Sequence, residues 1–341
     1  MPHRANSFHA LRLLAATMVI HAHAFVLSGS GPDPVSAYTG GASSGAVAVW
    51  MFFVISGWLV TASYASDPHL ARFTARRLLR IFPALALTVV ATALLLGPMV
   101  TTLPAADYFR HPSTPAYLGN VFLVRLQDLL PGVFAANPFP NAVNGSLWTL
   151  QPELLCYIGI AGLGACALLR AEAVAAALLV SIASQQAMLA YADTTHWAVL
   201  LKVRLMLEFM VFFLSGSLAW LLRDAIRFHW IAVPVLFAAL CALGPAGYGQ
   251  LVLFALLPYA TLSVALLDTG TSSFFERIGD WSYGTYLWAF PIQQSLMAWD
   301  ARMPLPLFML SSVILSWLAG ALSWHLVERR ALAFKPARRA R

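Results

Sequence analysis

The feature that most constrains this chain is a series of apolar runs, each roughly twenty residues long, that fill most of its 341 residues. Inside a bilayer core the backbone has no water to bind, so such a run crosses as a helix that satisfies its own N–H and C=O groups. Charged residues make up 10% of the chain, against about 25% in soluble domains. The sequence therefore predicts an all-α integral membrane protein.

We expect about ten transmembrane helices in one bundle, with residues 1–341 forming a single transmembrane domain and no soluble second domain. The ten runs cover residues 8–28, 43–64, 78–99, 147–169, 173–191, 198–222, 230–245, 250–267, 281–300 and 305–327. One long loop, 100–146, separates the third and fourth runs and is rich in Pro and Asn. A loop of that length is usually either functional or disordered.

The basic residues predict the orientation. With the N-terminus inside, 16 of the 21 Lys and Arg residues fall on the cytoplasmic side, which favours two cytoplasmic termini in a multi-pass protein of the cell membrane. These cations lie at the ends of runs, where they suit membrane lipids and not nucleic acid. No Cys/His cluster has metal spacing, so no metal is expected.

The first run contains LRLLAATMVIHAHAF at residues 11–25, with three ionisable residues that are costly inside a membrane. Arg12 and His23 are eleven positions apart, which is three helical turns plus about 20°, so they share one face with a rise of roughly 16 Å between them. His21 falls on the opposite face. A titratable group inside a span is by default a functional candidate, and His23 is the histidine we expect to act with Arg12.

The second run contains FFVISG at residues 52–57. Ser56 and Gly57 are small enough to let two membrane helices pack closely. Close packing is one interpretation of this motif, and a site-lining role for Ser56 is the other.

At the cytoplasmic entrance of the third run stands ARFTARRLLRIFP, residues 71–83. Arg77 and Arg80 are three positions apart and therefore neighbours on one helix face. They either anchor the helix to lipid phosphates or form a bidentate cradle for a phosphorylated ligand entering from the cytosol. The spacing alone does not separate the two interpretations.

The fourth run opens with NGSLWTLQPELLCY, residues 144–157. Glu153 lies about two turns inside it, where a carboxylate is expensive unless it is paired, protonated or facing water. Lys202 or Arg204 is a possible structural partner. A catalytic role, or one in orienting a histidine, is the hypothesis we favour.

The ninth run carries an aromatic cluster within IGDWSYGTYLWAFPIQQ, residues 278–294. An interfacial belt is one explanation and a substrate-lining surface is the other. Asp280 precedes the run and is expected to cap its helix. Near the end of the last run, His325 and Glu328 are one turn apart and are interpreted as a structural pair.

Together these motifs resemble the membrane-bound acyltransferase 3 family, the O-acetyltransferases of polysaccharides and related glycans. Five motifs occur in the family's order between about residues 5 and 330. The first motif is a basic residue followed, after a gap of ten residues, by a histidine, and Arg12 and His23 match it. The other four are MFFVISGWL at 51–59, the RxxR motif at Arg77 and Arg80, SLWTLQPELLCY at 146–157 and WSYGTYLW at 281–288.

The chain departs from the family pattern at two positions. The family usually has an aspartate three residues before the arginine of the first motif, where this chain has His9. The family's late segment usually ends in YLWH, whereas Ala289 follows Trp288 here. An orienting carboxylate at the first position and a histidine at the second are therefore not available.

The resemblance implies transfer of an acyl group, acetyl above all, from cytosolic acyl-CoA as co-substrate to a hydroxyl of a carbohydrate or lipid-linked glycan. In such enzymes the histidine is a general base or transient acyl carrier, and paired arginines hold the donor's phosphates. The candidate residues are His23, Glu153 and Arg12 for catalysis, Arg77, Arg80 and Ser56 for donor binding, and Trp148, Tyr283, Tyr286 and Trp288 for the acceptor.

A transporter or flippase for a glycolipid or small molecule is the alternative, because transporters also carry ionisable residues inside the membrane. We detect no internal repeat, which counts against it. The motifs leave the identity of the acceptor and the length of the acyl chain open.

Overall fold

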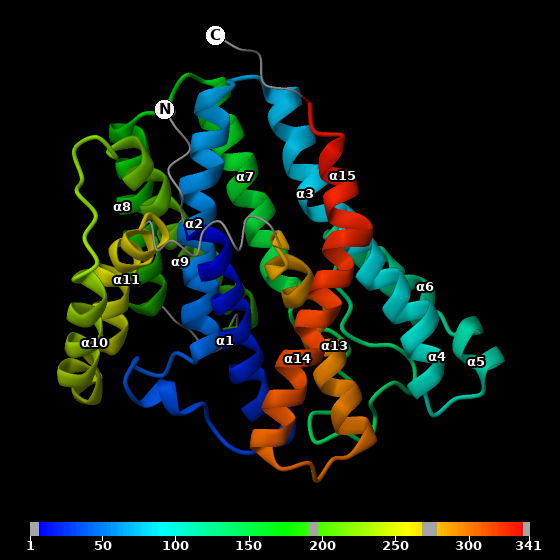
Figure 1. The fold of residues 1–341 in the computed structure, drawn as a ribbon. Helices are drawn as coiled ribbons and strands as arrows, with labels where there is room; N and C mark the ends of the chain where they lie inside the picture. Colours follow the sequence, from blue (N-terminus) through cyan, green and yellow to red (C-terminus); the bar gives the residue numbers. More distant parts are fainter. Residues whose placement is uncertain (1–6, 191–196, 268–277, 337–341) are drawn as a thin grey trace.

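The computed structural model describes residues 7–190, 197–267 and 278–336, and its regular elements are helices (Figure 1). The longer helices are α1 (Phe8–Ser28), α2 (Ser44–Ser66), α3 (Leu70–Ala91), α7 (Leu150–Ala165), α8 (Ala171–Ala190), α9 (Trp197–Leu221), α10 (Ala232–Leu243), α11 (Gly249–Ala265), α13 (Ser282–Trp299) and α14 (Leu305–Ser323). The shorter ones are α4 (Gly97–Val100), α5 (Ala105–Arg110), α6 (Ser113–Leu118) and α15 (Arg329–Ala333). The prediction of an all-helical fold is confirmed for these ranges.

Seven helical stretches of the described chain are long and apolar enough to cross a membrane. Two of the ten expected runs, 147–169 and 281–300, form α7 and α13, which are not among the seven. The stretch Ala232–Ala265 counts once, although the backbone at Gly247 (φ 88°) breaks it into α10 and α11. The membrane class of the protein follows from these stretches, whereas the count of ten and the side on which the termini lie stay predictions.

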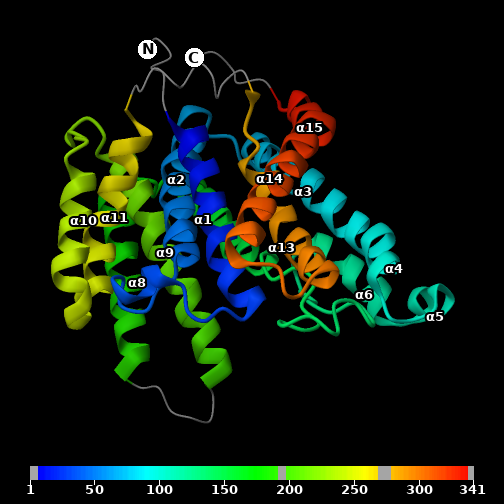
Figure 2. The ribbon, with the colours of Figure 1, turned by 60° about the horizontal axis from the view of Figure 1, so that its bottom comes forward.

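Helices α1 and α2 lie in the middle of the molecule (Figure 1). Helices α8 to α11 gather on one side of them, and α3 to α6 extend to the other. The turned view of Figure 2 keeps this arrangement, with α10 and α5 at opposite edges. Helices α13 and α14 pack against each other, and both contact α1.

Small residues bring α2 and α9 into backbone contact. A Cβ atom on Gly57 would lie 1.9 Å from the carbonyl oxygen of Phe213, and one on Gly216 would lie 2.0 Å from that of Val54. No larger side chain fits at either position, and such close approach is how helices associate where lipid removes the hydrophobic drive. The packing interpretation of the SG motif therefore holds for Gly57.

The long loop between α4 and α7 is folded against the bundle. Tyr108 and Tyr117 are almost completely buried in it. Asn137 and Asn144 donate hydrogen bonds to backbone carbonyls of α13, at Gln294 (2.8 Å) and Leu287 (3.0 Å). These contacts hold the loop along the middle of α13.

Candidate functional site

A cavity of about 490 Å³ runs between α1, α2, α3, α7 and α13, which is a usual volume for a ligand site. Its wall on α2 consists of residues at helical spacing on one face, namely Val49, Phe52, Phe53, Ser56, Leu59 and Ser63. The fourteen steps from Val49 to Ser63, at 1.5 Å of rise each, make this wall roughly 21 Å long. The cavity is a channel that suits an extended ligand.

Four charged side chains, here called the ion cluster, meet beside the channel: Arg12, Arg80, Asp280 and Glu328. Asp280 Oδ2 accepts from Arg12 Nη1 (3.0 Å) and Arg80 Nη2 (2.5 Å). Arg80 Nη1 also donates to Glu328 Oε2 (3.3 Å). Both carboxylates are buried, and their two charges balance those of the two guanidinium groups. The cluster joins α1, α3, the segment before α13 and the segment after α14 at one level of the bundle.

The expectation that Asp280 caps the ninth helix is wrong. Trp281 is the residue before α13, and no side chain caps this helix. Instead, Oδ2 of Asp280 accepts hydrogen bonds from the two arginines, and Oδ1 accepts one from the Ser282 hydroxyl (2.5 Å). Two buried arginines draw the carboxylate because charge-assisted hydrogen bonds are stronger than a neutral cap.

Arg77 lines the channel in different surroundings. Its guanidinium lies over the rings of Phe73 and Tyr157, 5.9 Å and 5.7 Å from their centroids. Its Nε atom is buried without a hydrogen-bond partner, and no carboxylate of the described chain forms an ion pair with it. Arg77 therefore presents uncompensated donors to the channel, whereas Arg80 is held by two acids.

Glu153 lies halfway along the channel and is bound through one oxygen. Its Oε1 accepts from Ser56 Oγ (3.1 Å) and from the Tyr157 hydroxyl (2.5 Å). The partners that the sequence offered, Lys202 and Arg204, do not take this role. Ser56 thus both lines the channel and holds the carboxylate of Glu153 in place.

Two tyrosines of α13 line the channel. Tyr283 donates to the backbone carbonyl of Ile81 (3.0 Å), close to Arg80. Tyr286 hydrogen bonds with the Thr149 hydroxyl (2.6 Å), and its own hydroxyl lies 3.0 Å from the Ser146 carbonyl. Tyr283 belongs to the arginine-rich part of the channel and Tyr286 to its opposite end.

His23 lies just beyond that opposite end. Its ring packs edge-on against Phe290, with 5.2 Å between centroids, and its Nδ1 atom is buried without a partner. Val19 and Tyr286 pack together one turn earlier on α1 and α13. His23 is therefore not a lining residue of the channel, and one helical turn, about 6 Å, separates it from the level of Tyr286.

Two candidate acceptor residues also lie outside the channel. Trp148 is 41% exposed and stacks obliquely on Phe209, with 5.3 Å between centroids. Trp288 is half-buried on α13 and does not line the cavity. The structure thus brings together all the candidates except His23, Trp148 and Trp288.

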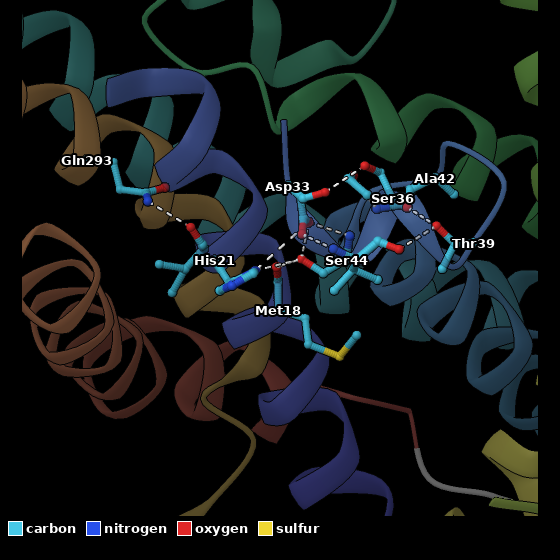
Figure 3. Close-up of polar contacts among 12 residues, drawn as sticks. Met18, His21, Asp33, Ser36, Thr39, Ala42, Ser44 and Gln293 are labelled. Carbon is cyan, nitrogen blue, oxygen red and sulfur yellow. Dashed lines mark hydrogen bonds and ion pairs between the residues drawn. The ribbon is translucent and has the colours of Figure 1, made fainter. Parts of the chain in front are cut away.

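His21 does not line the channel, and Figure 3 shows its ring beside Ser44 and Asp33. Its Nδ1 lies 2.9 Å from the hydroxyl of Ser44, at the start of α2. Ser44 donates its amide and hydroxyl hydrogens to Asp33 Oδ2 (2.6 Å and 2.5 Å). The three side chains tie α1 to the beginning of α2, whereas Arg12 and His23 on the other face meet Asp280 and Phe290.

Sequence reasoning missed three residues of the site. Tyr157 follows Glu153 by four positions on one helix, so the i,i+4 rule was an available signal. Asp280 and Glu328 lie 200 and 248 positions from Arg80, and no local pattern indicates that they meet it.

The chain is similar to known proteins over most of its length. A family model described as an acyltransferase domain matches residues 6–324. A protein of Shigella phage Sf6 named O-acetyl transferase is 31% identical over 337 residues, which is 97% of each chain. Nodulation protein 10 of Rhizobium leguminosarum bv. viciae is 34% identical over 159 residues, 45% of this chain and 42% of that protein. No solved structure matches the chain.

Proposed function

The chain belongs to the acyltransferase 3 family of membrane acyltransferases, and we propose that it transfers an acetyl group from cytosolic acetyl-CoA to a hydroxyl of a carbohydrate or lipid-linked glycan. The name of the phage relative, O-acetyl transferase, supports acetyl as the group and oxygen as its destination. The observation that carries the proposal is the channel, which begins among arginines and ends one turn from His23.

The donor's phosphates suit the arginine-rich end. Arg77 has a buried, unpaired Nε–H group there, and guanidinium groups bind phosphate oxygens through charge-assisted hydrogen bonds. An extended pantetheine arm then passes Ser56 and Glu153, and the thioester comes to the level of Tyr286. The wall of roughly 21 Å along α2 accommodates this arrangement.

The acceptor hydroxyl meets the thioester at the His23 end. The hydroxyl oxygen attacks the thioester carbonyl carbon, the carbon–sulfur bond breaks, and the proton taken by His23 is passed to the CoA sulfur. Imidazole suits this step because its neutral ring nitrogen accepts the proton and the protonated ring can then give it up. Trp148, exposed outside the channel, is available to an acceptor sugar.

Purified protein with acetyl-CoA and a panel of free and lipid-linked sugars tests this function. Free CoA should appear only when an acceptor is present, and His23→Asn should lower the rate by about 10²–10⁴-fold, as expected for loss of a general base. His21→Asn is the matched control, because this histidine lies on the same helix and contacts Ser44 outside the channel. Wild-type protein that binds CoA but never releases it with any acceptor would favour a transporter.

A further inference from the structure

A third arginine of α3, outside the RxxR motif, also lines the channel. Arg76 is 4% exposed and binds Asp67 Oδ2 through Nη1 (2.7 Å). Its Nε and Nη2 atoms are buried with no hydrogen-bond partner among the described residues. Unpaired guanidinium N–H groups in such a place are costly, so they indicate a ligand that accepts hydrogen bonds.

Asp67 does not neutralise this arginine. The same carboxylate binds Arg72 through two hydrogen bonds from Nε and one from Nη2, so two cations share one negative charge. Arg72 and Arg76 together hold the pKa of Asp67 below its usual range. The excess positive charge remains at Arg76, which lines the channel, while Arg72 does not.

The C-terminal segment adds a third cation to this end. Leu332, Lys335 and Pro336 line the channel, because α15 packs against α3. They follow the last residue matched by the family model, position 324. We call Arg76, Arg77 and Lys335 the cation wall. The cation wall lies near the Ser63 end of the channel, because Arg76 binds Asp67, the residue that directly follows α2.

We propose that Arg76 and Lys335 bind the 3′-phosphate of the donor's adenosine, with Arg77 on the phosphates nearer the pantetheine arm. The assignment rests on the proposed function, which requires the thioester at the Tyr286 end and therefore the adenosine at the other. A phosphate monoester carries close to two negative charges at neutral pH. Arg76 shares one acid with Arg72, and Arg77 forms no ion pair in the described chain, unlike the ion cluster, where two acids already hold Arg12 and Arg80.

The test compares the affinities of the purified protein for CoA and for dephospho-CoA, which lacks only the 3′-phosphate. Wild-type protein should bind CoA at least tenfold more tightly. Arg76→Gln and Lys335→Gln should each weaken CoA binding by about tenfold and leave dephospho-CoA binding almost unchanged, as the loss of one charge-assisted hydrogen bond predicts. Arg76→Lys, which keeps the charge, should recover part of the difference.

Two variants serve as matched controls. Arg72→Gln removes the other partner of Asp67 outside the channel, and Arg330→Gln removes an exposed cation of α15 that does not line it. Both should keep the wild-type preference for CoA. Equal wild-type affinity for CoA and dephospho-CoA would overturn this inference while leaving the proposed function intact, as would an unchanged preference in Lys335→Gln. Absence of any CoA binding would overturn both.

Discussion

The ion cluster and the cation wall both include arginines of α3, yet the surroundings of these arginines differ. Arg80 lies between Asp280 and Glu328, with its charge balanced and its donors occupied. Arg77, three positions earlier, meets two aromatic rings and keeps a buried N–H group free. The RxxR motif beside the channel therefore contains one arginine suited to a structural role, Arg80, and one suited to binding a ligand, Arg77.

The difference follows from what the rest of the chain supplies. The ion cluster receives its acids from two distant segments, and a buried charge is tolerated only when it is paired. In the cation wall, Arg76 shares the acid Asp67 with Arg72, and Arg77 lies over aromatic rings. We therefore expect substitutions in the ion cluster to lower stability first and substitutions in the cation wall to lower donor affinity first.

The largest expected effect comes from Asp280→Asn, which leaves Arg12 and Arg80 with an unbalanced buried charge. The free energy of unfolding should fall by about 3–5 kcal/mol, the usual cost of breaking a buried ion pair. Denaturant titration in detergent measures it. Asp224→Asn is the control, because Asp224 pairs with Arg223 while 81% exposed. Equal stability of the two variants would contradict a structural role for the ion cluster.

Arg77→Gln should have the next largest effect, and on a different quantity. Loss of its charge-assisted hydrogen bonds, about 1.5–3 kcal/mol, corresponds to a 10- to 100-fold weaker binding of CoA. The unfolding free energy should stay near the wild-type value, because no carboxylate loses its partner. A titration of CoA binding alongside the denaturant curve separates the two, and a large loss of stability with normal CoA affinity would reverse the comparison.

Glu328→Gln should have the smallest effect of the three. Arg80 keeps Asp280, and the amide oxygen at the position of Oε2 still accepts from Arg80, while the NH2 group at the position of Oε1 can donate to the Ser323 hydroxyl. A loss of about 1–2 kcal/mol of stability is expected, and it should not add to that of Asp280→Asn because both act through Arg80. Simple additivity in the double variant would show that the two acids do not form one cluster.

Several parts of the site were predictable from periodicity alone. The eleven-residue spacing places Arg12 and His23 on one face of α1, and both indeed meet residues at or before α13, while His21 meets Ser44. The pattern of small residues at 56–57 indicated close packing, which Gly57 provides. Helical periodicity carries this information because it is a property of neighbouring residues on one element.

The spacing of Arg77 and Arg80 did not predict that the two arginines have different partners. The i,i+3 rule makes them neighbours, but it says nothing of Asp280 or Glu328, which arrive from the other end of the chain. The same limit applies to Arg76, whose position in the channel depends on how α3 packs against α2 and α15. His23 also lies one turn farther from the channel than the ordered motifs implied.

The sequence by itself determined that this protein is helical, embedded in a membrane and a member of its family, because these properties reside in hydropathy and in motifs a few residues long. Only the tertiary structure decided which arginines carry a partner and which keep open donors. The physical reason is that the role of a buried charge depends on the charge opposite it, and here the opposing acids are 200 and 248 positions from Arg80 and nine positions from Arg76.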